Sequence, residues 1–159
     1  MALQGIDISN WQKGINLDAL AIDFAICKAT QGTSYVSPDC DRQMQQAMKR
    51  GLLVGVYHYV NGAGVDAEAQ HFANSIKGYL GKALIVLDWE QGDNAAWGNT
   101  GYLDSLVAKV KTLTGVTPLI YASQSVFPWD IAKKHGCGTW VAQYANNNTT
   151  GLQGSPWNE

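Results

Sequence analysis

Two acidic residues follow an apolar segment in the stretch "KALIVLDWEQGD" (82–93). The five apolar residues 83–87 are typical of a strand that is buried on both faces in a parallel sheet. Asp88 and Glu90 come next, two residues apart, so a continuing strand would point both to one side and Trp89 to the other. Their Cα atoms would then lie about 6.6 Å apart, from two strand rises of about 3.3 Å.

Two carboxylates at this spacing repel each other when both are charged, so in a partly apolar pocket the pKa of one of them rises. The protonated group can act as a general acid near neutral pH. Hydrolysis of a glycosidic bond uses such a pair, one acid for the leaving oxygen and one anion for the cationic sugar. Adjacent acids on one strand suit attack by the substrate's own 2-acetamido group better than attack from opposite faces of the sugar.

A second chemistry is open to the same residue types. Asp7 ends another strand-like segment, and Asp7, Asp88 and Glu90 could together hold a divalent cation, as in phosphoryl-transfer enzymes. We prefer the catalytic pair, because no GxxxxGK[ST] phosphate loop occurs. The chain also has six Trp and seven Tyr, whose flat apolar faces and polar edges suit sugar rings as well as any core or interface. We therefore expect no metal and no cofactor.

Strand-like and helical patterns alternate along the chain. Apolar residues at helical spacing predict helices over 39–50, 66–80 and 101–114, with Asp66 as the cap of the second. This β-α-β-α order predicts an α/β fold with a parallel sheet and outer helices, either an open sheet or a barrel, and no GxGxxG follows the first strand. The predicted strands, about six where a full barrel needs eight, are 5–9, 24–30, 52–59, 83–90, 117–123 and 139–144.

Polar side chains gather at the carboxyl ends of these strands, where parallel α/β folds build their sites. We expect residues two apart to face one side of their strand, and Asp7 to be the partner of Lys28, since a lysine that ends an apolar strand needs an acid or water. His58 is more often a hydrogen-bonded structural residue than a base, and the tyrosines suit core and site equally. The set is Asp7, Ser9, Lys28, Thr30, Tyr57, His58, Tyr59, Asp88, Glu90, Tyr121 and Ser123.

The composition excludes several classes of protein. The chain has 159 residues, enough for one domain, with 46% hydrophobic residues, 15% charged residues and a net charge of -2. We expect no nucleic-acid partner without a basic patch, and no membrane insertion without an apolar run that spans a bilayer. The first residues lack the pattern of a signal peptide. Cys27, Cys40 and Cys137 form no metal or redox motif, which predicts free thiols.

In combination, these segments resemble glycoside hydrolase family 25, the lysozymes that cleave bacterial cell walls and include many phage endolysins. The resemblance implies an irregular (β/α) TIM-like barrel, a single catalytic domain over 1–159, and N-acetylmuramidase activity. The bond cleaved is then the β-1,4 bond from N-acetylmuramic acid to N-acetylglucosamine, and the partner is the peptidoglycan glycan strand. The resembling stretches are "GIDISNWQ", "FAICKATQGTSYVSPD", "GLLVGVYHYV", "ALIVLDWE", "TGVTPLIYAS" and "TWVAQY".

The resemblance also implies roles for single residues. Glu90 matches the general acid of the family, and Asp88 matches the carboxylate that stabilises the 2-acetamido group or the oxocarbenium centre. Asp7 matches the acid on the first strand. The positions that match substrate-contacting groups are Lys28, Tyr35, Tyr57 and Tyr121.

The chain departs from the family at its end. Family domains run on to a final strand with another site aspartate, but here no acid follows Asp130 except Glu159. We therefore expect a barrel without its last strand and no separate wall-binding module. An incomplete barrel leaves the oligomeric state open, and the chain could self-associate. It also leaves a second interpretation of the function, a glycan-binding domain with weak or no turnover. Without an export signal, we expect synthesis in the cytoplasm of a phage-infected bacterium and action on its cell wall.

Overall fold

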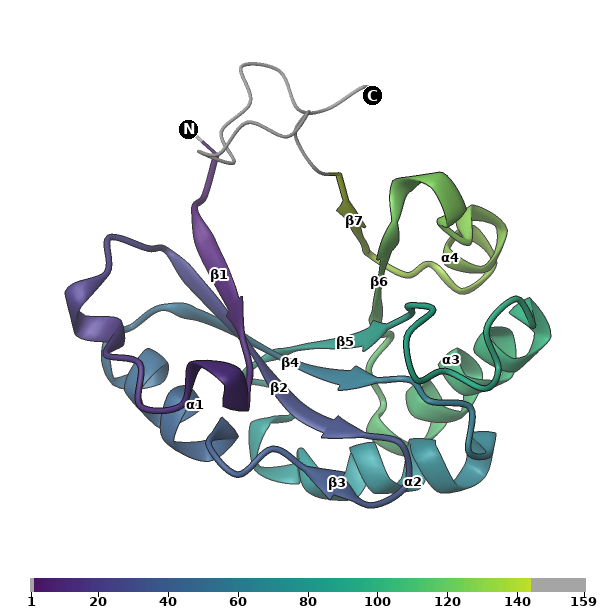
Figure 1. Cartoon of the computed structure of the whole chain (residues 1–159), viewed down its shortest axis with the longest axis horizontal. Coiled ribbons are helices and arrows are strands. Elements are labelled where there is room, and N and C mark those ends of the chain that lie inside the picture. Colours follow the sequence, from purple (N-terminus) through teal and green to yellow (C-terminus); the bar gives the residue numbers. More distant parts are fainter. Residues whose placement is uncertain (1, 144–159) are drawn as a thin grey trace.

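The computed structural model describes residues 2–143, which form one curled sheet with helices along its convex side (Figure 1). The strands are β1 (Gly5–Ile8), β2 (Phe24–Gln31), β3 (Tyr35–Val36), β4 (Leu53–Tyr59), β5 (Leu84–Asp88), β6 (Leu119–Ser123) and β7 (Thr139–Ala142). The α-helices are α1 (Cys40–Lys49), α2 (Val65–Ser75), α3 (Thr100–Thr114) and α4 (Trp129–His135). Short 3-10 helices are η1 (Asn10–Gln12), η2 (Leu17–Ala19), η3 (Lys77–Tyr79) and η4 (Gln124–Val126).

The sheet has the order β1-β2-β4-β5-β6-β7, with every neighbouring pair parallel. The strand β3 lies off this path and pairs antiparallel with β2. Within residues 2–143, β1 and β7 are the two edges and do not pair with each other, so this part of the chain is a curled half-barrel. This confirms, for the described residues, the prediction of an α/β barrel that is incomplete. The predicted absence of a final strand with its aspartate concerns residues 144–159, outside that range.

The predicted strands and helices are found, with differences at the ends of elements. The helix α2 begins after Gly64, which is its N-cap, and Asp66 does not cap it. Asp66 instead pairs with Lys109 of α3 at 2.7 Å. This helix also ends at Ser75, short of the predicted residue 80, and η3 follows. The strand β3 and the helix α4 were not predicted, because two and seven residues are too few to show a period, and neither were the 3-10 helices of three residues each.

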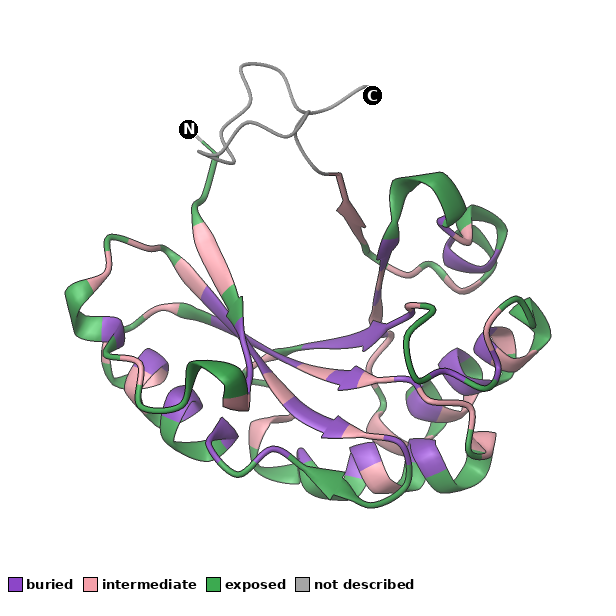
Figure 2. Cartoon of the chain, viewed as in Figure 1, coloured by how far each residue is buried: buried purple, intermediate pink, exposed green. Residues whose placement is uncertain are grey.

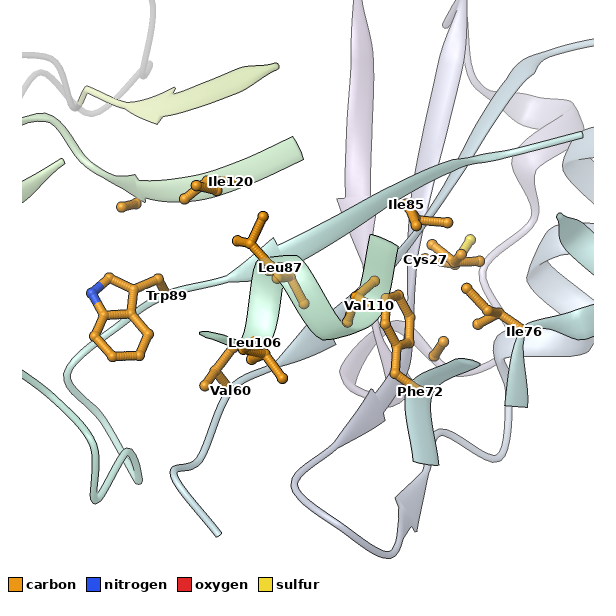
Figure 3. Close-up of a cluster of buried hydrophobic side chains, with 14 of the residues drawn as sticks. Cys27, Val60, Phe72, Ile76, Ile85, Leu87, Trp89, Leu106, Val110 and Ile120 are labelled. Carbon is orange, nitrogen blue, oxygen red and sulfur yellow. The ribbon is translucent and has the colours of Figure 1, made fainter. Parts of the chain in front are cut away.

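The core lies between the sheet and the helices, and Figure 2 shows buried residues along the inner faces of both. Alternate residues of β5, Ile85 and Leu87, point toward the helices and are almost fully buried. They meet Phe72 of α2 and Leu106 and Val110 of α3 (Figure 3). The apolar stripe that predicts α3 is therefore its buried face. The three cysteines are free, as predicted, and none of the helices in the described part is long and apolar enough to cross a membrane.

A buried polar group connects two strands to α2. The Nε2 atom of His58 lies 3.3 Å from Glu68 Oε2, and its Nδ1 atom lies 2.8 Å from Thr30 Oγ1. Glu68 also accepts the backbone N–H groups of Asn61 and Ala63. Burial lowers the pKa of His58, so the ring is neutral at pH 7 and donates from Nε2. Burial alone would raise the pKa of Glu68, but the hydrogen bonds that it accepts hold that pKa below its usual value.

These contacts make His58 a hydrogen-bonded structural residue, which is the role expected from the sequence. Glu68, itself fully buried, accepts hydrogen bonds from a buried ring nitrogen and two backbone groups. We expect Glu68→Ala to lower the free energy of unfolding by about 3–5 kcal/mol, because it leaves the buried His58 donor without its acceptor. Asp66→Ala removes a surface pair on the same helix, with the aspartate side chain 83% exposed, and should change stability by less than about 1 kcal/mol. Urea unfolding of the two variants tests this, and equal losses would contradict it.

Candidate active site

A cavity of about 230 Å³ lies at the carboxyl ends of the strands. Six of the seven residues predicted for the site line it, contributed by five strands and the residues that follow them. Its walls are Asp7, Ser9, Trp11, Lys28, Tyr57, Tyr59, Asp88, Glu90, Tyr121 and Trp140. The seventh predicted residue, Tyr35, lies on β3 outside this lining, and it approaches the cavity through Lys28, whose Nζ atom is 5.5 Å from its ring centre.

The parallel register brings these side chains to one level. Tyr59 of β4 pairs with Asp88 of β5, Asp88 with Tyr121 of β6, and Tyr121 with Trp140 of β7. The rings of Tyr121 and Trp140 meet edge to face, with centres 4.7 Å apart. The curl of the sheet thus turns one row of strand positions into one wall of the cavity.

Asp88 and Glu90 face the cavity together, as their spacing predicts. Trp89 points the other way into the core, where it is 3% exposed and its ring lies 5.6 Å from that of Trp97. The backbone beyond β5 is held by the side chain of Asn94, whose Nδ2 atom donates to Glu90 O at 2.9 Å. Tyr59 adds a hydrogen bond from its hydroxyl to the carbonyl of Gly92. Both contacts fix the loop that carries Glu90.

On β2, Lys28 and Thr30 do not face the same side of the strand, although they lie two residues apart. The pairing of β2 with β4 shifts between Lys28 and Thr30. Lys28 therefore faces the cavity, whereas Thr30 is buried on the helix side with His58. An alternation rule assumes a regular strand, and this irregularity breaks it.

The prediction that Asp7 is the partner of Lys28 is wrong. The Nζ atom of Lys28 donates to Gln31 Oε1 at 2.6 Å and lies 4.8 Å from the ring centre of Tyr59. Among residues 2–143, Lys28 and Asp7 form no ion pair. The register explains this, because Asp7 pairs with Ile26, two residues before Lys28. Burial lowers the pKa of Lys28, and the negative charges of Asp88 and Glu90 oppose that shift.

The carboxyl group of Asp88 is the buried member of the pair. The residue is 8% exposed, and its Oδ1 atom has no hydrogen-bond partner among the described residues. Burial, and then the charge of Glu90, raises the pKa of Asp88 to about 8, against the opposing charge of Lys28. Desolvation also raises the pKa of Asp7, although its side chain is open to the cavity. The predicted rise in one pKa of the pair therefore falls on Asp88, while Glu90 remains partly open to water.

The alternative of a cation site has no ligand set in the described part of the chain. No group of three or more His, Cys, Asp or Glu side chains there is arranged to hold a metal ion. The cavity instead brings carboxyl groups together with the aromatic rings of tyrosine and tryptophan side chains.

The model of glycosyl hydrolases family 25 matches residues 6–159. The chain belongs to this family. It is 34% identical to Lysozyme M1 of Streptomyces globisporus, over 97% of this chain and 59% of that one. A muramidase of Trichobolus zukalii has the same fold with a TM-score of 0.74 and 27% identity, over 92% of this chain and 79% of that chain. The catalytic domain of endolysin ply40 from bacteriophage P40 of Listeria monocytogenes has the same fold with a TM-score of 0.73. The identity is 25%, and the match covers 93% of this chain and 77% of that chain.

This chain spans little more than half the length of several curated relatives, 59% in the case of Lysozyme M1. Within the family 25 fold, sequence reasoning did not assign four of the cavity residues: Ser9, Trp11, Tyr59 and Trp140. Ser9 and Tyr59 stand out as polar residues at strand ends. Trp11 and Trp140 lie in two of the stretches that resemble the family, but no local pattern marks them as cavity residues. The curl of the sheet decides which tryptophans reach the cavity, and a local sequence pattern carries no information about that curl.

The raised pKa of Asp88 makes stability depend on pH in a defined direction. Between about pH 4 and pH 8 the folded chain keeps the Asp88 proton that the unfolded chain has released. Rising pH therefore destabilises the fold through this group, by at most about 1.4 kcal/mol per pH unit. We expect Asp88→Asn to be increasingly more stable than the wild type from pH 5 to pH 8, as measured by urea unfolding. A stability difference that stays constant over this range would contradict the burial of this carboxyl.

Proposed function

We propose that this family 25 chain is a peptidoglycan hydrolase, an N-acetylmuramidase that acts as one catalytic domain over residues 1–159. The observation that carries the proposal is the pair Asp88 and Glu90, side by side at the end of β5 in a cavity with aromatic walls. The lysozyme and muramidase names of its relatives support the same substrate class. The bond cleaved is the β-1,4 bond from N-acetylmuramic acid to N-acetylglucosamine.

In this proposal Glu90 is the general acid. It is the accessible carboxyl of the pair, and it can give its proton to the glycosidic oxygen as the C1–O bond breaks. The sugar that remains becomes positively charged at C1. Its 2-acetamido oxygen can form a bond to C1, and Glu90, now anionic, then activates the water that completes hydrolysis. The position of both acids at the end of β5 supports this route, because both approach the sugar from the same side.

Asp88 stabilises this positive charge in the proposed mechanism. In the free chain its raised pKa keeps the proton of the pair on Asp88 at neutral pH. Transfer of that proton to Glu90 supplies the general acid and leaves Asp88 as the anion. A developing positive charge nearby favours the anionic form of a carboxyl, so Asp88 interacts more strongly with the transition state than with the bound substrate. Lys28 favours the same anion. Asp88 can also accept the N–H of the acetamido group and so orient it.

The remaining predicted residues have supporting roles. Asp7 faces the cavity from β1 and completes its negative charge. Tyr57 and Tyr121 line the cavity and are placed to contact the sugar. Tyr35 does not line it, and we assign it an indirect role, in which its ring confines the Lys28 ammonium together with that of Tyr59. The cell wall is the proposed place of action, and the likeness to a phage endolysin domain supports a phage origin.

Digestion of purified Gram-positive peptidoglycan tests the proposal. We expect the wild type to release reducing ends that, after borohydride reduction and mass spectrometry, carry reduced muramic acid. Glu90→Gln keeps the size of the side chain but removes the acid, and should lower the rate by at least about 100-fold. Asp93→Asn is the matched control, since it removes a carboxyl from the same loop, and its backbone φ of 49° suits asparagine.

The outcomes separate the alternatives. Reduced glucosamine ends would assign a different bond, and equal rates for Glu90→Gln and the wild type would remove Glu90 from its role. Wall binding without new ends in any variant would identify a glycan-binding domain.

A further inference from the structure

Trp11 is the most exposed large apolar side chain among the described residues, at 93%. It lies in η1, immediately after β1, and it lines the cavity that contains the acids. Exposure of a whole indole leaves a large apolar face in water. The side chain therefore contributes little to the core, and its use must be sought in the cavity.

The backbone of Trp11 is fixed although its side chain is free. Ser9 Oγ accepts the N–H of Trp11 at 3.2 Å, and Gln12 Oε1 accepts the N–H of Ser9 at 2.9 Å, a reciprocal capping arrangement. Gln43, fully buried in α1, donates from Nε2 to the carbonyl of Ser9 at 2.9 Å. The short helix is thus attached to the core. A rigid backbone presents an aromatic ring at a low entropic cost of binding.

Other tryptophans of the described chain have ring partners. Trp89 packs with Trp97, Trp140 with Tyr121, and Trp129 with Phe127 at 4.3 Å between ring centres. No ring contact of this kind involves Trp11 within residues 2–143. Both faces of its indole remain available to a ligand, which distinguishes it from the tryptophans that stabilise the fold.

Trp11 and Trp140 line the same cavity from opposite edges of the sheet, because Trp11 follows β1 and Trp140 belongs to β7. In Figure 1, β1 and β7 lie on opposite sides of the concave face. The strand β5, at whose end Asp88 and Glu90 lie, comes between β1 and β7 in the strand order. A glycan chain that crosses this face has its cleaved bond at the acids and a neighbouring sugar ring toward β1. The C–H face of a pyranose matches the flat apolar face of an indole.

We propose that Trp11 is a sugar-binding residue that stacks on a pyranose ring of the glycan, on the β1 side of the ring whose bond is cleaved. This inference rests on the proposed function, because it takes the substrate to be a glycan chain that continues beyond the cleaved bond. Trp11 contributes apolar contact without proton transfer, so it acts on binding and not on the chemical step.

The test measures binding by calorimetry in the Glu90→Gln background, where turnover does not interfere. The probe is a tetrasaccharide of alternating N-acetylglucosamine and N-acetylmuramic acid without stem peptides. Adding Trp11→Ala should weaken binding about five- to tenfold, the scale of uncovering part of an indole face. Trp11→Tyr should restore most of the affinity. Trp129→Ala is the matched control, because Trp129 is also exposed, at 53%, but lies outside the cavity lining.

Folding should not obscure the result. Trp11 takes part in the capping arrangement only through its backbone N–H, so we expect the alanine variant to melt at the wild-type temperature. In the active chain the same change should raise KM and leave kcat within about twofold.

Three outcomes would overturn the inference, and they can be told apart. If the Glu90→Gln chain binds the tetrasaccharide equally well with and without the added Trp11→Ala substitution, the role of Trp11 alone is overturned. Absence of tetrasaccharide binding in every variant would overturn both this inference and the proposed function. A fall in kcat with KM unchanged would also overturn the inference, because stacking on a remote ring does not predict that pattern.

Discussion

The alternation of side chains along β5 is the constraint on which the site depends. Ile85, Leu87 and Trp89 point toward the helices and are nearly inaccessible to water. Asp88 and Glu90, which directly follow Leu87 and Trp89, consequently face the cavity. A shift of one residue would place both acids against the helices and the apolar side chains in the cavity. The packing of Leu87 and Trp89 therefore fixes where the carboxyl groups point, and the orientation of the acids follows from the hydrophobic core.

That arrangement carries an electrostatic penalty, which the surroundings offset in part. Asp88 is buried beside the charge of Glu90, and one of its oxygens has no partner among the described residues. The opposing charge comes from Lys28, which is itself held by Gln31 and by the rings of Tyr35 and Tyr59. Residues of β2, β3 and β4 thus act on a carboxyl of β5 through one ammonium group. This explains how Tyr35 can matter to the site from outside the cavity lining.

The features that follow from local pattern could be predicted from sequence, and those that depend on pairing between strands could not. The shared face of Asp88 and Glu90 needs only side chains that keep alternating for two residues past the end of β5, and the stripe of α3 needs only a helical period. The partner of Lys28 depends on the register of β1 against β2, and the side taken by Thr30 depends on an irregularity against β4. The site aspartate expected from the family concerns residues outside 2–143.

The curl of the sheet links these observations to chemistry. It brings the row from Tyr59 to Trp140 around Asp88, which removes water from that carboxyl and raises its pKa. Glu90 lies two residues further along, beyond the end of β5, and keeps access to water. One short sequence thus places two chemically similar groups in different environments, and environment separates the roles of paired carboxyls. The aromatic walls that a sugar would contact are the same side chains that create the difference.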